Sequence, residues 1–223
     1  TLMLETNRNY DFQAGTLGAI TTNILGHFDH NGGTFTGGSI TVAGASGALY
    51  ELDGAGASLV SADLLITSDG TFTHRAGSTD ITNLAAVEDS GVVNIDGATL
   101  TAKELEVRIG GLTQISGGGT LDVGTIDILS SGRIEQSGGT TEITGNLDID
   151  NPGAGGASQF KLLAGTLIAS GLIADGTQST INFAYDQNSG TASFDSVSLV
   201  TKGAGRINGG SAVVTGTTTL VGD

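Results

Sequence analysis

Cysteine is absent from this sequence, proline occurs once and tryptophan does not occur at all. The lack of cysteine excludes a disulfide framework and any thiolate metal site. The single proline, together with the absence of a three-residue period, excludes a collagen triple helix. Aromatic residues make up only 4% of the chain, so aromatic platforms that grip sugars or bases must be few.

Basic residues are also scarce, since eight Lys and Arg face 23 Asp and Glu and the net charge is −15. This balance repels phosphate backbones and anionic lipid head groups. No run approaches the ~20 apolar residues that span a bilayer, and no signal peptide is recognisable. We therefore expect no nucleic-acid partner and no membrane insertion. Because the chain starts at Thr1 and its repeat continues to the end, we interpret it as a mature or excised segment.

Glycine and short alternating apolar stretches dominate what is present. The chain contains 38 glycines and is 38% hydrophobic, which is too apolar for a disordered segment. Glycine-punctuated phrases such as GHFDHNGGTF, GTFTHRAGST and GRIEQSGGTT share one form, and a Thr or Ser follows the glycines. These markers recur every 18 to 26 residues, at Thr16, Thr34, Ser58, Thr79, Thr99, Thr120, Thr140, Thr166, Thr191 and Ser211. The longer spacings coincide with the turn-rich stretches NPGAGGAS (151–158) and DQNSG (186–190), which we expect to be surface loops.

Each repeat contains three short apolar pieces with period two, the pattern of strands with one buried side. The first piece follows the marker directly, as in Phe35, Leu59, Leu100, Leu121 and Leu167. The second comprises pairs such as Ile40 with Val42, Leu64 with Ile66, Leu105 with Val107, Ile126 with Ile128 and Leu147 with Ile149. The third comprises Phe28, Phe72, Val93, Leu112, Ile134, Phe160 and Ile207.

Three such pieces in roughly 20 residues are too short for helices and too closely spaced for hairpins. The sequence therefore predicts an all-β fold, a right-handed, three-sided parallel β-helix (β-solenoid) of about ten coils of roughly 20 residues. We expect one domain over 1–223, with longer, irregular coils around 150–200.

The phrases GTFTHRAGST, GRIEQSGGTT and GGGTLDVGTIDI resemble the G-T-F-x-Q-x-G-G-T-L repeats of large exported bacterial proteins, including autotransporter-like passenger domains and surface adhesins. The resemblance covers most of the chain and is strongest between Gly54 and Leu147. It implies export, a β-helical passenger and an extracellular or cell-surface setting. It supplies no catalytic residue.

Two sets of polar residues repeat from coil to coil. His30, His74, Gln114 and Gln136 share one offset, and we interpret them as an inward or corner-facing ladder because a zinc site needs four converging ligands. Glu106, Asp127 and Asp148 occupy outward positions in three successive coils. Carboxylates stacked ~5 Å apart repel one another, so they are either solvated and screened or bind calcium. The sequence lacks the nonapeptide that builds calcium into some β-rolls, which favours the solvated alternative.

The segment INFAYDQNSG (181–190) is the first place to search for a ligand site, with Phe183, Tyr185 and Asp186 as candidates. Polysaccharide lyases and hydrolases also use parallel β-helices, but the eight basic residues are scattered. We therefore predict a non-enzymatic structural or adhesive module without a cofactor, calcium excepted. The alternative is a carbohydrate-active or carbohydrate-binding β-helix. The expected partners are further coils or copies stacked end to end, and surface glycans.

Overall fold

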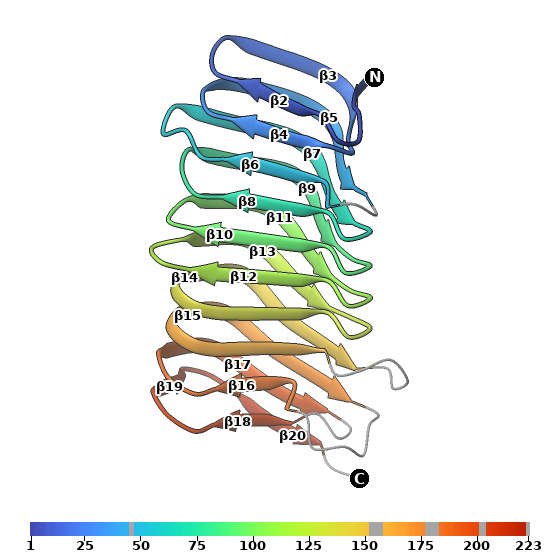
Figure 1. The fold of residues 1–223 in the computed structure, drawn as a ribbon. Helices are drawn as coiled ribbons and strands as arrows, with labels where there is room; N and C mark the ends of the chain where they lie inside the picture. Colours follow the sequence, from blue (N-terminus) through green and yellow to red (C-terminus); the bar gives the residue numbers. More distant parts are fainter. Residues whose placement is uncertain (45–46, 152–157, 177–182, 201–203, 222–223) are drawn as a thin grey trace.

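The computed structural model describes residues 1–44, 47–151, 158–176, 183–200 and 204–221. These residues contain twenty strands, and every pairing between strands is parallel. The strands stack along one axis from the N-terminus to the C-terminus (Figure 1). The predicted all-β parallel solenoid of about ten coils is therefore confirmed.

Each regular coil consists of one short and one long strand. The short strands are β2 (Asn9–Phe12), β4 (His27–His30), β6 (Leu49–Leu52), β8 (Thr71–His74), β10 (Val92–Asp96), β12 (Leu112–Ser116), β16 (Tyr185–Gln187) and β18 (Gly205–Ile207). The long strands are β3 (Thr16–Ile24), β5 (Gly33–Ala43), β7 (Ala57–Thr67), β9 (Ser78–Val87), β11 (Thr99–Val107), β13 (Thr120–Ile128) and β17 (Thr191–Val200).

Other coils depart from this division. β14 (Arg133–Asn151) and β15 (Gln159–Gly176) each run through a short and a long segment without a break. In the last coil the long segment is divided into β19 (Ser211–Val214) and β20 (Thr218–Val221), and β1 (Leu2–Leu4) precedes the first coil. The turn-rich stretch NPGAGGAS falls mostly outside the described residues, whereas Asp186 and Gln187 of DQNSG belong to β16 and not to a loop.

The long strands bend near their middle, and this bend separates two of the predicted apolar pieces. The pairing register shifts between Ala102 and Glu104 in β11 and between Val123 and Ile126 in β13. Such irregularities break a strand's direction without ending it. The first and second apolar pieces consequently lie in one strand, on either side of the bend.

The core is a set of inward columns, each with one residue per coil. Columns built from the first and second pieces are confirmed, since Leu59, Leu100 and Ile126 are fully or almost fully buried in register with their counterparts. At about 25 cal/mol per Å² of apolar area, these side chains contribute most of the stability. They do so only when the adjacent coils cover them.

Four positional predictions were wrong by one or two residues. Ser78, and not Thr79, occupies the marker column, and Thr79 lies inside between Leu59 and Leu100. Gly205, and not Ile207, continues the column of the third piece.

In the stretch Leu112 to Ile115, Thr113 and Ile115 face inward, so the predicted inward Leu112 and Gln114 lie on the outer side. Leu112 and Ile115 are three residues apart and cannot both point inward from a strand. The observed choice buries Ile115 directly above Ile95 and leaves the Gln114 amide in water, which avoids burying an amide without partners.

No helix that could span a membrane occurs among the residues that the structure describes. The backbone hydrogen bonds form the parallel ladder between coils, and turns add others, such as the bond from Gly91 N to the Glu88 carbonyl (2.8 Å).

Candidate functional site

The outer face of the short strands carries one polar side chain per coil at a single register position. We call this row the polar ladder. It consists of Asp11, Asp29, Glu51, Thr73, Asn94, Gln114, Glu135, Lys161, Asp186 and Arg206. Because alternate residues of a strand point to opposite sides, the buried inward columns on both sides of this position, one mostly apolar and one mixed with His and Gln, force the ladder outward.

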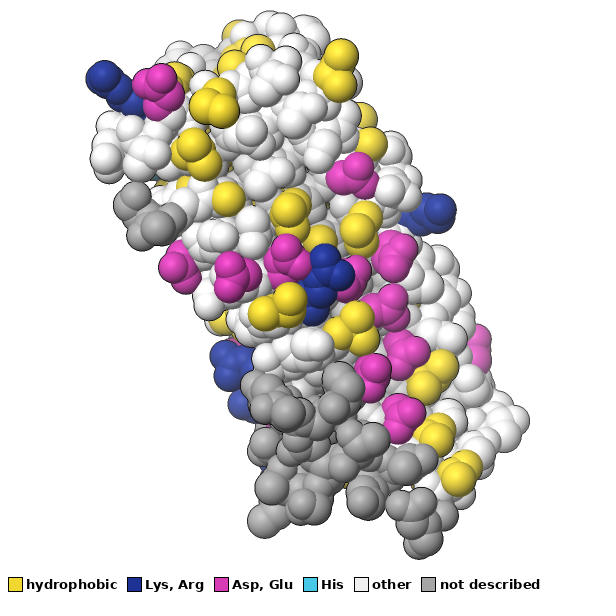
Figure 2. Space-filling model, turned by 90° about the vertical axis from the view of Figure 1, so that its right-hand side faces the viewer, with side chains coloured by type: hydrophobic (Ala, Val, Ile, Leu, Met, Phe, Trp, Pro, Cys, Tyr) yellow, Lys and Arg dark blue, Asp and Glu magenta, His cyan; other side chains and the backbone are white. Residues whose placement is uncertain are grey.

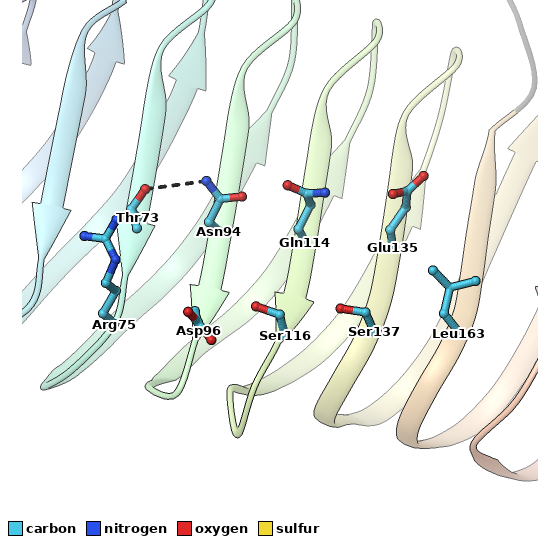
Figure 3. A pocket seen from close by; sticks show the side chains of 9 residues that line it. All are labelled: Thr73, Arg75, Asn94, Asp96, Gln114, Ser116, Glu135, Ser137 and Leu163. Atoms are coloured by element: carbon cyan, nitrogen blue, oxygen red, sulfur yellow. Dashed lines mark hydrogen bonds between the residues drawn. The ribbon is translucent and has the colours of Figure 1, made fainter.

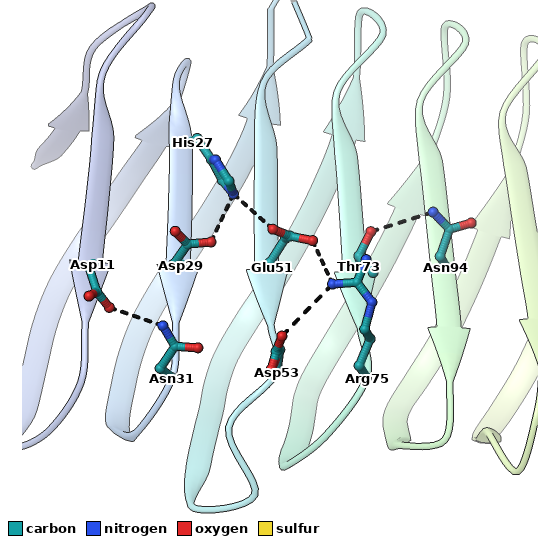
Figure 4. A network of polar contacts seen from close by, with 9 residues as sticks. All are labelled: Asp11, His27, Asp29, Asn31, Glu51, Asp53, Thr73, Arg75 and Asn94. Atoms are coloured by element: carbon teal, nitrogen blue, oxygen red, sulfur yellow. Dashed lines mark hydrogen bonds and ion pairs between the residues drawn. The ribbon is translucent and has the colours of Figure 1, made fainter.

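At its N-terminal end the ladder is part of a charged network (Figure 4). Nε2 of His27 lies 2.8 Å from Oδ1 of Asp29 and 2.9 Å from Oε2 of Glu51. Arg75 donates from Nη1 to Oε1 of Glu51 at 2.6 Å and lies 4.0 Å from Asp53. The hydrogen bond from Arg75, together with His27, lowers the pKa of Glu51, whereas burial and the neighbouring carboxylates raise the pKa of Asp29.

This network brings together side chains that could hold a metal ion. Among the residues that the structure describes, His27, Asp29 and Glu51 are the one group of three His, Asp or Glu whose ligand atoms all lie within 4.8 Å of one another. The sequence analysis missed it. The available signal was the alternation His27-x-Asp29 in one strand, with Glu51 one coil later.

Further along, the ladder borders an open hollow of about 390 Å³ (Figure 3). Two rows of side chains line it, Thr73, Asn94, Gln114 and Glu135 on one side and Arg75, Asp96, Ser116, Ser137 and Leu163 on the other. Within the lining, Asn94 Nδ2 donates to Thr73 Oγ1 at 3.5 Å. Amide, hydroxyl and carboxylate groups at one position per coil can hydrogen-bond a hydroxyl-rich chain lying along the axis.

The predicted carboxylate column lies where the sequence placed it. Glu106, Asp127 and Asp148 are paired in register on β11, β13 and β14. Burial, Asp148, Glu104 and Glu106 raise the pKa of Asp127. Arg108 neutralises Glu106 by a direct ion pair and also pairs with Glu88, with Nε 2.6 Å from Oε2. Acidic side chains outnumber basic ones on the face shown in Figure 2. Calcium binding by this column stays a prediction.

The three candidate ligand residues of the segment 181–190 point in different directions. The ring of Tyr185 lies inside the coil, 2% exposed, and its hydroxyl donates to Oε1 of Gln187 at 2.9 Å. Asp186 accepts two hydrogen bonds from Arg206, at 3.0 and 2.7 Å, and the same guanidinium lies 4.4 Å from the centroid of the Phe183 ring. Phe183 and Asp186 therefore share one partner within the protein, while Tyr185 packs in the core.

The inward row predicted from His30, His74, Gln114 and Gln136 is confirmed at three of these four positions. Gln136 donates to the carbonyl groups of Gly139 and Thr166, and His30 lies 2.9 Å from the Tyr50 hydroxyl and 3.1 Å from the Gly33 carbonyl. His74 is fully buried, yet neither ring nitrogen has a hydrogen-bond partner among the described residues. Gln114 lies outside, as stated above. Gln187 was not predicted as a member, although it follows the same Gln-x-x-Gly spacing.

No family model matches this chain, and it has no significant match among the curated proteins or the solved structures that were compared.

Proposed function

We propose that this chain is a non-enzymatic structural or adhesive module, a stiff rod in an extracellular or cell-surface setting. One observation supports the proposal above all others. Several of its outer polar side chains contact a side chain of the next coil, and these contacts reinforce the backbone ladder.

These cross-coil contacts recur along the rod. Arg75 pairs with Glu51, Arg108 with Glu88 and Arg206 with Asp186, at 2.6, 2.6 and 2.7 Å. Amide contacts have the same direction, as between Asn83 and Asp63 at 2.8 Å and between Asn208 and Asn188 at 2.9 Å. Exposed pairs contribute only about 0.2–1 kcal/mol each, so their effect is to align neighbouring coils and not to drive folding.

The shape of the isolated protein tests this proposal. Ten coils about 4.8 Å apart make a rod of about 45–50 Å, which small-angle X-ray scattering and negative-stain electron microscopy can measure. A rod of that length that also resists proteolysis is expected. A globular scattering profile, or rapid cleavage within the coils between Ala57 and Ile149, would contradict the proposal.

The last coil offers a surface for the proposed end-to-end association. Its inward-column residues Ile207 and Leu220 are 57% and 72% exposed because no coil covers them. Uncovered strand edges pair readily with further strands. We expect neighbouring coils of a longer chain, or a second copy, to cover this end. Analytical ultracentrifugation over a concentration series checks the second case, and a monomer at all concentrations would exclude it.

The export part of the proposal depends on the resemblance of the G-T-F-x-Q-x-G-G-T-L phrases. Its test is the location of the native protein in intact cells. Cleavage by an added protease, or labelling by an antibody without permeabilisation, is expected, and a protein found only after lysis would contradict it.

A second candidate function is glycan binding, which the hollow along the polar ladder favours. A panel of neutral and acidic polysaccharides tests it by binding and by release of reducing ends. Binding that is lost in Asn94→Ala with Gln114→Ala would establish a glycan-binding function. Turnover that is lost in Asp96→Asn or Glu135→Gln would overturn the non-enzymatic proposal.

A further inference from the structure

We propose that His27, Asp29 and Glu51 form a binding site for a divalent transition-metal ion, with zinc as the ion that best suits one imidazole and two carboxylates. Imidazole nitrogen and carboxylate oxygen are both zinc ligands, whereas calcium and magnesium prefer oxygen alone.

Strand geometry brings the three ligands together. His27 and Asp29 are separated by one residue in β4 and therefore point to the same outer side. Glu51 of β6 is paired directly with Asp29. His27, Asp29 and Glu51 thus form a triangle on the outer surface of two adjacent strands (Figure 4). Because all three belong to strands, no loop has to move to bring them together.

The distances suit a metal ion. Nε2 of His27 lies 2.8 Å from the Asp29 oxygen and 2.9 Å from the Glu51 oxygen. Ligands that bind one zinc ion at about 2.0–2.2 Å are separated by about 3.0–3.5 Å in octahedral or tetrahedral geometry. An ion therefore requires only small side-chain rotations. All three side chains are partly exposed, so the ion has a path from solvent and waters can complete its coordination.

The network without a metal is electrostatically incomplete. A single protonated nitrogen faces two carboxylate oxygens, and it can direct its one N–H well at only one of them. A dication would satisfy both oxygens at once.

A neighbouring side chain orients one ligand. Arg75, on the next coil, donates a hydrogen bond to Oε1 of Glu51 at 2.6 Å. The other carboxylate oxygen, Oε2, then faces His27. Hydrogen bonds to a ligating carboxylate are a regular feature of metal sites and typically affect affinity 10–100-fold. The bound ion would link β4 to β6 and would therefore cross-link two consecutive coils.

The experiment uses the full chain after treatment with a chelator and exchange into metal-free buffer at pH 7.5. Isothermal titration calorimetry with zinc chloride is expected to show one tight site per chain, and zinc is expected to raise the melting temperature. In His27→Gln and in Asp29→Asn, this affinity should fall by at least about tenfold, and the thermal shift should disappear. Glu135→Gln is the matched control, because it removes the same charge from the same ladder beside Arg133 and should bind zinc as the unaltered chain does.

Imidazole NMR of the unaltered chain provides a readout that does not depend on any variant's folding. The sequence contains three histidines, and His30 and His74 are fully buried. Zinc should shift the ring signals of His27 alone. Unchanged His27 signals, equal zinc affinity in His27→Gln, an equal loss in Glu135→Gln, or equally tight calcium binding at this site would each overturn the proposal.

Discussion

At the residue scale, the turns after several short-strand segments combine an inward side chain with a glycine three residues later, as in His30 with Gly33 and Gln136 with Gly139. Gly33, Gly77, Gly139 and Gly190 all have positive φ, between +66° and +84°, a region that residues with a Cβ disfavour. Where the inward side chain is His30, Gln136 or Gln187, it contacts the carbonyl of that glycine. An amide or imidazole thereby satisfies a buried backbone acceptor at a corner that the sheet ladder does not reach.

His74 departs from this arrangement, and its replacement should stabilise the protein. Leu52 and Ile95 flank it in the same column, and its ring nitrogens are unpartnered. A buried polar group without a partner costs about 1–3 kcal/mol. His74→Leu should therefore raise the free energy of unfolding at pH 7 by a similar amount in urea denaturation. A clear loss of stability would mean that the ring makes a contact of its own.

The same histidine makes the stability depend on pH. Burial lowers the pKa of His74 from 6.5 to about 4, so between these values the unfolded chain binds the extra proton. Stability should fall as the pH decreases through this window, by about 3 kcal/mol in total from this group. The difference in unfolding free energy between His74→Leu and the unaltered chain should widen from pH 7 to pH 4. A constant difference would contradict the assigned cause.

Glycine at the corners should be needed for two separable reasons. A Cβ at Gly139 would overlap the carbonyl oxygen of Gly119 in the coil before it, whereas a Cβ at Gly110 would meet nothing within 4 Å. Both have positive φ, which alone costs about 1–2 kcal/mol for a residue with a Cβ. Gly139→Ala should destabilise the protein clearly more than Gly110→Ala, as measured by thermal unfolding, and equal effects would mean that the coils separate readily.

At the element scale, the carboxylates of Glu106, Asp127 and Asp148 on β11, β13 and β14 repel one another in the folded protein. The pKa of Asp127 and that of Asp148 are raised, first by burial and then by neighbouring carboxylates. A raised carboxyl pKa means that the folded state favours the protonated form, so this contribution to stability is present at low pH and lost as the pH rises.

Neutralising one member should relieve this repulsion. Asp127→Asn should raise the free energy of unfolding at pH 7 by up to about 1 kcal/mol, and the gain should vanish near pH 3, because the raised pKa of Asp127 leaves its carboxyl mostly protonated there. Asp122→Asn, on the outer side of the same strand, is the control. A larger gain in the control would assign the effect to net charge in general.

Calcium binding by the same column would make the melting temperature depend on calcium. If Glu106, Asp127 and Asp148 bind calcium, chelation should lower the melting temperature and added calcium should restore it. An unchanged transition would leave the column as a solvated, screened surface.

At the scale of the whole molecule, β1 and β20 lie on the same side of the solenoid. β1 pairs with the second half of β3, and β20 pairs with the second half of β17. If a second copy placed its β2 on β18 of the first, its β1 would occupy the position of β20. Complete stacking of two copies therefore requires β1 to leave its place.

Removal of β1 should consequently favour end-to-end association. A variant lacking residues 1–6 should sediment as larger species at lower concentration than the 223-residue chain, with rods that lengthen in steps in electron micrographs. Unchanged or weaker association would show that β1 does not obstruct this contact.

Specific residues show how far sequence reasoning reached. The columns of Leu59, Leu105 and Ile126 were predicted correctly because strict alternation around glycine-bounded turns permits only one side to be buried. The stretch from Leu112 to Ile115 was misassigned because it places an apolar residue on each side. Local alternation cannot choose between them, and the strands above and below decide.

The candidate metal site shows the same division. The alternation His27-x-Asp29 is the one signal in the sequence near this site. It does not identify the site by itself, because the third ligand, Glu51, lies a whole coil away and the coil lengths vary from 18 to 26 residues. The glycine-punctuated, period-two pattern by itself determined an all-β stack of coils, since three short apolar pieces that recur about every 20 residues are buried when successive coils stack. The pairing register between coils exists only once the chain has wound. For that reason, only the tertiary structure decided which outward side chains face one another, where the hollow lies and which three ligands converge.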